Sequence, residues 1–151
     1  MNETAVVDAS IAGRWVLEDE KTDEALELLA RCAQLTLTLV VPELWWYEMV
    51  NVLRTAAMRG RTSPEDAKRS LDVRRNLPLV VVSAEDQGVP AILSSALAHR
   101  LSGYDATYFN LAESRGLKLV TSDRHLLGLA HKFPWILTLN EFVRKLPRAD
   151  Q

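Results

Sequence analysis

Short apolar runs alternate with longer amphipathic stretches along this chain. Five runs rich in valine, leucine and isoleucine predict strands at residues 5–7, 37–41, 79–82, 118–121 and 136–139. Between them, apolar side chains recur at helical spacing and predict helices at residues 23–34, 43–58, 64–76, 85–101 and 104–115. Strands that are apolar throughout and alternate with helices are typical of a mostly parallel sheet with helices on both faces. The expected fold is therefore α/β, a three-layer α/β/α sandwich around a sheet of four to five strands.

Turn-forming residues predict where several helices begin and end. Ser63 followed by Pro64 is a start signal, because serine caps the free amides of a first turn and proline suits its first position. Gly60 ends the helix before it, and Gly116 ends the helix at 104–115. Two helices joined by so short a break predict a helical hairpin over residues 54–75 that projects from the body.

The size and composition of the chain fit one domain spanning residues 1–151. With 151 residues, 48% of them hydrophobic, the chain can fill a core without disulfides. Cys32 is the single cysteine, which fits a reducing compartment. The N-terminal segment lacks the basic start of a signal peptide, and no apolar run approaches the ~20 residues of a membrane span. We therefore expect a cytoplasmic protein without a membrane partner.

The charge of the chain is unevenly distributed, although its net value is only −2. Acidic residues crowd positions 18–27, whereas basic residues crowd positions 54–75 and 115–148. Such asymmetry permits a basic face that contacts the phosphates of a nucleic acid. The candidate contacts are Arg59, Arg61, Arg74, Arg75 and Arg124. The simpler interpretation is that these side chains are solvated helix surface.

Four acidic residues stand at strand ends or on helices that follow strands: Asp8, Glu48, Asp105 and Asp123. Ligands of open α/β sheets bind in the crevice at the carboxyl ends of the strands, where Asp8 and Asp123 fall. Carboxylates gathered there repel one another unless protons or cations neutralise them. Because no clustered cysteine or histidine accompanies them, a hard divalent cation is the expected ligand. The competing interpretation is that Asp8 and Asp123 are helix N-caps and that Asp105 stabilises a helical first turn.

Glu48 is the most informative of the four because of its surroundings. Its helix is apolar almost throughout, which predicts burial on most of the circumference. Glutamate is rarely buried without a partner, and Asn51 lies three residues on, on the same face. The two side chains predict a polar strip that lines a site. The alternative is a narrow stripe that faces solvent.

Four segments together resemble the PIN-domain ribonucleases, and most closely the VapC-type toxins of toxin–antitoxin pairs. Val6-Val7-Asp8-Ala9-Ser10 is similar to the family's opening strand, and Glu48-Met49-Val50-Asn51 to its Glu-x-x-Asn helix. Tyr104-Asp105-Ala106-Thr107-Tyr108 is similar to its Asp-Ala helix start, and Thr121-Ser122-Asp123 to its final Thr-x-Asp segment. Each motif is weak alone, but all four occur in the family's order over essentially the whole chain.

The resemblance implies a PIN-like sandwich that acts as a metal-dependent endoribonuclease, with Mg²⁺ as the cofactor and Mn²⁺ as a substitute. Under this interpretation Asp8 is the principal metal ligand, and Glu48 and Asp105 complete the first metal site. Asp123 holds a second ion or orients the attacking water, whose pKa the metal lowers. The side chains expected to orient these carboxylates are Ser10, Asn51 and Thr121.

The resemblance also implies three partners, namely an RNA substrate, a cognate antitoxin and a second copy of the chain in a homodimer. Trp45 and Trp46, next to the basic hairpin, suit an interface. Two functions from other classes stay open. In one, the chain is a non-catalytic module that binds protein or RNA. In the other, Asp8 is the nucleophile of a phosphoryl transfer, which is disfavoured because Ser10 stands where the common Asp-x-Asp arrangement has a second aspartate.

Overall fold

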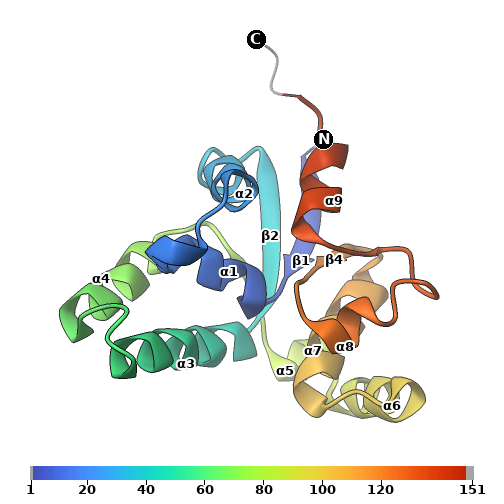
Figure 1. Ribbon diagram of the computed structural model, residues 1–151. Helices are drawn as coiled ribbons and strands as arrows, with labels where there is room; N and C mark the ends of the chain where they lie inside the picture. Colours follow the sequence, from blue (N-terminus) through green and yellow to red (C-terminus); the bar gives the residue numbers. More distant parts are fainter. Residues whose placement is uncertain (1, 149–151) are drawn as a thin grey trace.

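A five-stranded sheet forms the centre of the protein in a computed structural model that describes residues 2–148 (Figure 1). The strands are β1 (Glu3–Val7), β2 (Leu37–Pro42), β3 (Val80–Val82), β4 (Lys118–Val120) and β5 (Ile136–Leu137). They lie in the order β3-β2-β1-β4-β5, and each neighbouring pair is parallel. The α/β class and all five predicted strands are thereby confirmed. Since Val7 pairs with Val120, the chain leaves β1 and β4 at the same edge of the sheet.

The connections between the strands explain the layers. The chain moves from β1 to β3 through α1 (Ala9–Val16), a short 3₁₀ turn at Glu18–Glu20, α2 (Asp23–Ala33), α3 (Leu44–Met58) and α4 (Pro64–Arg75). It then reverses across the sheet through α5 (Ala84–Gln87), α6 (Val89–His99) and α7 (Gly103–Arg115), and ends with α8 (Arg124–Leu127) and α9 (Leu139–Lys145). Right-handed crossovers that run in opposite directions place their helices on opposite faces. Accordingly α7 packs on β1, β2 and β4, whereas α2 packs on β2 and also contacts α1 and α9.

Large aromatic side chains fill the core on both sides of the sheet. Trp15 of α1 and Trp45 of α3 are fully buried, with ring centroids 6.4 Å apart, and they join the two helices. The predicted role of Trp45 as an interface anchor is therefore wrong, and Trp46 is partly buried against its ring. No helix in the described part of the chain is long and apolar enough to cross a membrane.

Two predicted elements differ from the structure. The helix expected at 85–101 is two helices, because Gly88 adopts a positive φ of 93° that ends α5 and begins α6. The strand expected at 136–139 stops at Leu137, because Thr138 caps a helix instead. That helix, α9, begins with a capping box in which Thr138 and Glu141 satisfy each other's backbone amides.

The predicted hairpin of α3 and α4 lies to one side of the sheet (Figure 1) but is tied to the body. The Arg74 guanidinium donates a hydrogen bond of 2.8 Å to the backbone oxygen of Trp15, and Arg61 pairs with Asp19 at 2.7 Å. The expectation that α3 is buried on most of its circumference is wrong, since Tyr47 is 71% exposed and Met58 73%. Its outer face is open because the sheet and α1 cover only the side that carries Trp45.

Candidate active site

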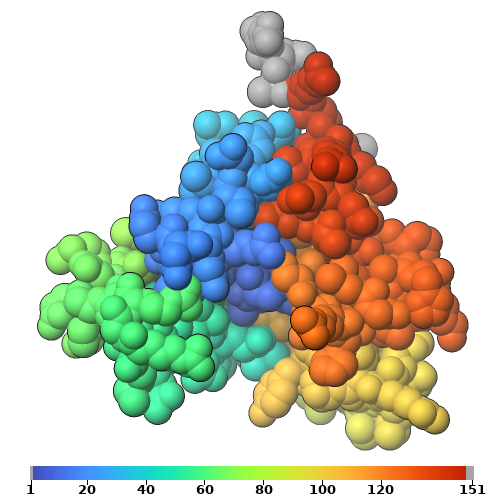
Figure 2. Space-filling model, viewed as in Figure 1, coloured from blue at the N-terminus to red at the C-terminus, as the bar shows by residue number. Residues whose placement is uncertain are grey.

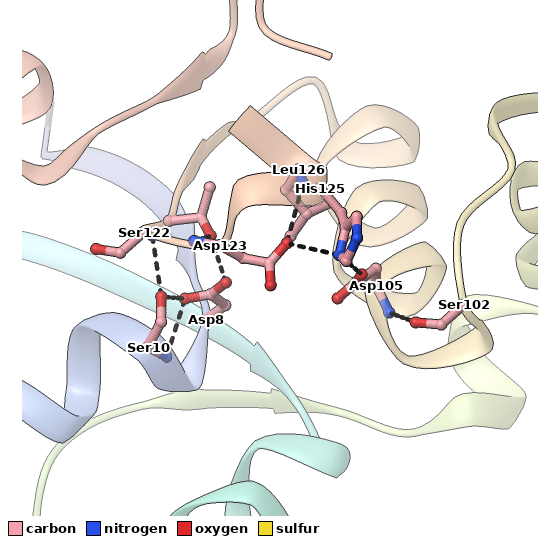
Figure 3. Close-up of polar contacts among 9 residues, drawn as sticks. Asp8, Ser10, Ser102, Asp105, Ser122, Asp123, His125 and Leu126 are labelled. Carbon is pink, nitrogen blue, oxygen red and sulfur yellow. Dashed lines mark hydrogen bonds and ion pairs between the residues drawn. The ribbon is translucent and has the colours of Figure 1, made fainter. Parts of the chain in front are cut away.

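Asp8 stands directly after the central strand, and hydroxyl groups hold both of its carboxylate oxygens (Figure 3). Oδ1 accepts hydrogen bonds from the Ser10 amide at 3.1 Å and from the Ser10 hydroxyl, and Oδ2 accepts one from the Thr121 hydroxyl. The side chain is buried, and this burial raises the pKa of Asp8 to about 6, against the lowering effect of its hydrogen bonds. Asp8 is thus both the N-cap of α1 and a carboxylate held in a fixed orientation.

The hydroxyl groups that hold Asp8 are themselves fixed by the segment after β4. The Ser122 amide donates to Ser10 Oγ, and the Asp123 amide donates to Thr121 Oγ1, each at 2.9 Å (Figure 3). Asp123 Oδ1 in turn accepts the Leu126 amide at 3.0 Å and caps α8. One network therefore joins the ends of β1 and β4 and sets the positions of two of the four acidic residues.

Glu48 reaches the same region from α3. Its Oε1 is buried and has no hydrogen-bond partner within residues 2–148. Burial raises the pKa of Glu48, and the charges of Asp8, Asp105 and Asp123 raise it further, whereas the neighbouring Tyr108 hydroxyl lowers it. A buried carboxylate oxygen without a donor is costly unless a proton or a cation neutralises it. Glu48 is therefore the strongest indication that this site is built for a positive charge.

Asp105 and Asp123 both lie near the imidazole ring of His125. His125 Nδ1 lies 4.0 Å from Asp105 Oδ2 and 4.0 Å from Asp123 Oδ1 (Figure 3). One ligand atom from each of the three residues falls within 4.8 Å of the others, a spacing that a metal ion can bridge. Burial and then the charge of Asp123 raise the pKa of Asp105, against the effect of His125. Ser102 caps α7, and Asp105 lies in the first turn of that helix, the position that the alternative interpretation gave it.

A cleft of about 640 Å³ opens between α3 and the start of α7, and two of the four acids, Glu48 and Asp105, line it. Glu48 and Asn51 line one wall, and Asp105 lines the other. The polar strip predicted for Glu48 and Asn51 is thus present, and it faces a hollow large enough for part of a substrate.

The structure brings the predicted acids together with the side chains expected to orient them. It also adds two residues to the site, and it places two of the predicted RNA-binding arginines away from it. Tyr108 lies beside Glu48, and burial and the Glu48 charge raise its pKa. Tyr108 lies three residues after Asp105, so both are on one face of α7. This spacing is the feature of the sequence that could have identified Tyr108. His125 is the second addition. Arg61 and Arg74, by contrast, turn toward residues 15–20 rather than toward the acids.

Comparison with known proteins identifies the family of this chain. The PIN domain family matches residues 5–132, a span that contains all four acidic residues. The chain belongs to the PIN domain family. It is 32% identical over 135 residues to ribonuclease VapC3 of Pyrobaculum aerophilum, an alignment that covers 88% of this chain and 97% of the relative. This PIN domain is thus of the VapC type, as the sequence resemblance implied. Exonuclease VapC9 of the same organism is 39% identical over 90 residues, covering 60% of this chain and 65% of that protein.

Solved structures show the same fold. The PIN domain superimposes on the PAE2754 protein of Pyrobaculum aerophilum with a TM-score of 0.63, at 26% identity, covering 95% of this chain and 88% of the other. It also superimposes on a chain of a toxin–antitoxin complex from Klebsiella pneumoniae with a TM-score of 0.59, at 16% identity, covering 89% and 97%. The three-layer arrangement of helices around a parallel sheet is therefore that of a PIN domain.

Proposed function

We propose that this VapC-type PIN domain is the toxin of a toxin–antitoxin pair and cleaves RNA as a metal-dependent endoribonuclease. The observation that carries the proposal is the buried Glu48 oxygen, which has no hydrogen-bond partner within residues 2–148 and lies near the charges of Asp8, Asp105 and Asp123. The similarity to a ribonuclease over most of the chain supports RNA as the substrate. The caps that Asp8 and Asp123 provide do not account for Glu48, so they do not explain the cluster as a whole.

The donor set fits a hard divalent cation. Carboxylate oxygens are the ligands that Mg²⁺ and Mn²⁺ prefer. Burial first, and then the charges of neighbouring acids, raise the pKa of Glu48 and of Asp105, and a cation among these carboxylates would relieve both effects. Asp8, Glu48 and Asp105 would hold the principal ion. When bound, such an ion activates water and neutralises charge that develops on the phosphate.

The residues of the chain itself supply orientation. Ser10 and Thr121 fix both oxygens of Asp8. Because the carboxylate is already oriented, it can bind a cation without a further loss of rotational freedom. Asn51 stands beside Glu48 in the cleft and can position either that carboxylate or a substrate oxygen. Asp123 is held as a cap through Oδ1 and orients the attacking water or a second ion. Phosphoryl transfer through Asp8 as a nucleophile fits less well, because Ser10 stands where the common Asp-x-Asp arrangement has a second aspartate.

The first prediction tests metal dependence and the mode of cleavage together. We expect the purified protein to cleave a circular single-stranded RNA in Mg²⁺ or Mn²⁺ and to lose this activity in EDTA. A circular substrate has no ends, so its linearisation requires an endonuclease. In parallel, Mg²⁺ should raise the melting temperature of the wild type but not that of Asp8→Asn with Asp105→Asn.

Asp72→Asn is the matched control, because Asp72 is an exposed aspartate on α4 whose one ion pair among the described residues is with Arg75, at 3.6 Å. It should keep both the metal-induced stabilisation and the cleavage. Equal stabilisation by Mg²⁺ in the double variant would rule out the proposed ligands. Cleavage restricted to linear RNA would replace the endonuclease with an exonuclease, the activity by which the relative VapC9 is named.

Arginine side chains bind the phosphates in this proposal, because the net charge of −2 gives no general attraction to RNA. Arg59, Arg75 and Arg124 are exposed, whereas Arg61 and Arg74 are engaged with the body. We expect Arg59→Ala with Arg75→Ala to reduce the slope of log affinity against log salt by about 0.7 for each phosphate that is no longer neutralised.

Arg124 is next to Asp123 in the sequence, so Arg124→Ala should lower the turnover rate more than it lowers the affinity for RNA. Slopes unchanged in all these variants would mean that the basic clusters are solvated surface.

The protein partners follow from the family and from the exposed surface. The cognate partner is an antitoxin, and the chain forms a homodimer. With Trp45 buried, we assign that dimer to the exposed apolar side chains of Val89, Leu93 and Leu97, which recur once per turn along α6. A monomer in light scattering at micromolar concentration would contradict the dimer.

A further inference from the structure

Two exposed tyrosines flank the acidic cleft. Tyr47 on α3 is 71% exposed and Tyr104 at the start of α7 is 67% exposed, and both line the same cleft as Glu48 and Asp105. Each tyrosine directly precedes one of these acids in the sequence. Among the described residues neither ring stacks on another aromatic side chain. An aromatic face left in solvent beside a candidate active site has no role in the core.

We propose that Tyr47 and Tyr104 are stacking platforms that hold unpaired bases on either side of the phosphate to be cleaved, so that the substrate segment is single-stranded. The inference rests on the proposed function and deepens it, because it names the residues that position the substrate. One platform comes from each wall of the cleft, α3 and α7, and each wall also carries one candidate metal ligand, Glu48 or Asp105. In Figure 2 the surface is notched between the lobe of α3 and α4 and the lobe that carries α6.

The charge of the site explains why stacking is needed. The four carboxylates repel the phosphates of an approaching strand wherever a cation does not neutralise them, and Glu48 and Asp105 belong to the cleft itself. Stacking of a base on a tyrosine ring contributes to affinity without any charge and tolerates every base, because each base has a π-face. Within a duplex the bases already stack on one another, and their faces are inaccessible. Neutral platforms beside an acidic centre therefore select unpaired RNA.

A peptide segment of an antitoxin is the other occupant with suitable chemistry. RNA is favoured because both rings line the same cleft as Glu48 and Asp105, the acids that would act on the phosphate. Antitoxin binding would not require both rings to adjoin the acids. The two occupants give different results in the same set of variants.

The experiment measures RNA affinity without cleavage. In an Asp8→Asn background, fluorescence anisotropy follows a short labelled RNA of mixed sequence, as a single strand or annealed into a duplex. Tyr47→Ala and Tyr104→Ala should each raise the Kd for the single strand by about 5- to 100-fold. The phenylalanine variants should bind within about twofold of the parent, since the ring is kept. The slope against salt should not change, because tyrosine neutralises no phosphate.

Two controls keep the test decisive. Met58→Ala removes another exposed apolar side chain, 73% exposed at the end of α3, and should leave the Kd unchanged. Duplex affinity should be the same in all variants. Melting temperatures confirm that the alanine variants are folded, as expected for side chains this exposed.

Three results would overturn the inference. If the double alanine variant binds single-stranded RNA as the parent does, the tyrosines are not platforms, and the proposed function survives provided the wild type still cleaves RNA. If phenylalanine is as harmful as alanine, the hydroxyl rather than the ring binds the RNA. If RNA affinity is unchanged but inhibition by the antitoxin weakens, the cleft is the antitoxin's site. A wild type that neither binds nor cleaves RNA would defeat the proposed function itself.

Discussion

Replacing Asp8 with asparagine is expected to lower the rate of RNA cleavage by on the order of a thousand-fold, because a metal centre contributes several kcal/mol to stabilising the transition state. Asp8 follows the central strand, and Ser10 and Thr121 orient both of its oxygens. Asparagine keeps the shape but loses the charge and one acceptor oxygen. The measurement is single-turnover cleavage at saturating Mg²⁺, with Asp72→Asn as the control.

The same variant also tests the electrostatics of the metal-free protein. The folded-state pKa of Asp8 is raised from 3.8 to about 6, so the folded protein binds this proton more tightly than the unfolded chain does. Ionisation therefore costs stability, and the cost grows as the pH rises from about 4 to about 6 and is complete above that range. The shift corresponds to about 3 kcal/mol.

Urea denaturation in EDTA at pH 4 and pH 8 measures this cost. Relative to Asp8→Asn, the wild type should lose stability between the two values, by somewhat less than the full value of about 3 kcal/mol, because part of the cost is already present at pH 4. Added Mg²⁺ should reverse the difference at pH 8. A variant that keeps more than a tenth of the activity, or a difference that does not depend on pH, would show that Asp8 acts only as a cap.

The gathering of the acids could be predicted because it follows from a few strong rules. The apolar runs before Asp8 and Asp123 identify two strands, and parallel strands deliver their carboxyl ends to one edge. The structure adds that β1 lies at the point where the connections reverse direction, with β2 on one side and β4 on the other. That these runs are buried parallel strands, and that Asp8 and Asp123 follow their carboxyl ends, can be read from the local sequence. This information was sufficient to predict that the two acids lie at one edge of the sheet.

The behaviour of individual glycines and tryptophans depends on tertiary contacts instead. Gly13 lies inside α1, where a Cβ atom would meet Val52 at 3.6 Å, whereas Gly88 breaks a predicted helix at a positive φ. The neighbouring residues in the sequence do not indicate which of the two glycines lies inside a helix and which one ends it. Likewise the adjacent Trp45 and Trp46 differ in burial only because α3 presents one of them to Trp15.

The last helix carries a start signal in its own sequence, whereas the pairing of two arginines does not. Thr138 and Glu141 form a capping box, which is recognisable without a structure and is sufficient to end the last strand and predict α9. The engagement of Arg61 and Arg74 was not readable, because their partners lie 42 and 59 residues away in the sequence. Long-range pairs of this kind decide which arginines remain available for phosphate, and only the fold reveals them.

Replacing Glu48 with glutamine is expected to reduce cleavage by at least a hundred-fold while leaving the metal-free protein as stable as the wild type or more stable. Burial and three neighbouring carboxylates raise the pKa of Glu48, and its Oε1 has no donor within the described chain. Glutamine has nearly the same volume and carries no charge, so it removes the repulsion without leaving a cavity. Residues that serve function at a cost to stability respond in this way.

The sign of the pH dependence distinguishes this account from a structural one. Because the folded-state pKa of Glu48 is raised, its ionised form destabilises the fold, and the advantage of glutamine should appear only above the pKa of the unfolded chain and then grow with pH. Urea midpoints in EDTA at pH 4 and pH 8 measure it. Glu48→Ala is the variant to compare with Glu48→Gln. It also relieves the repulsion among the carboxylates, but it removes the packing of the side chain as well.

Mg²⁺ should invert the comparison between wild type and Glu48→Gln. In the wild type the cation neutralises a carboxylate that is costly when bare, so metal binding adds to the stability of the fold. The glutamine variant begins without that cost and gains less from the metal, so its advantage in EDTA should shrink or reverse as Mg²⁺ is added. A large loss of stability in EDTA with cleavage retained would make Glu48 a structural residue, and the cleft between α3 and α7 would then need another centre.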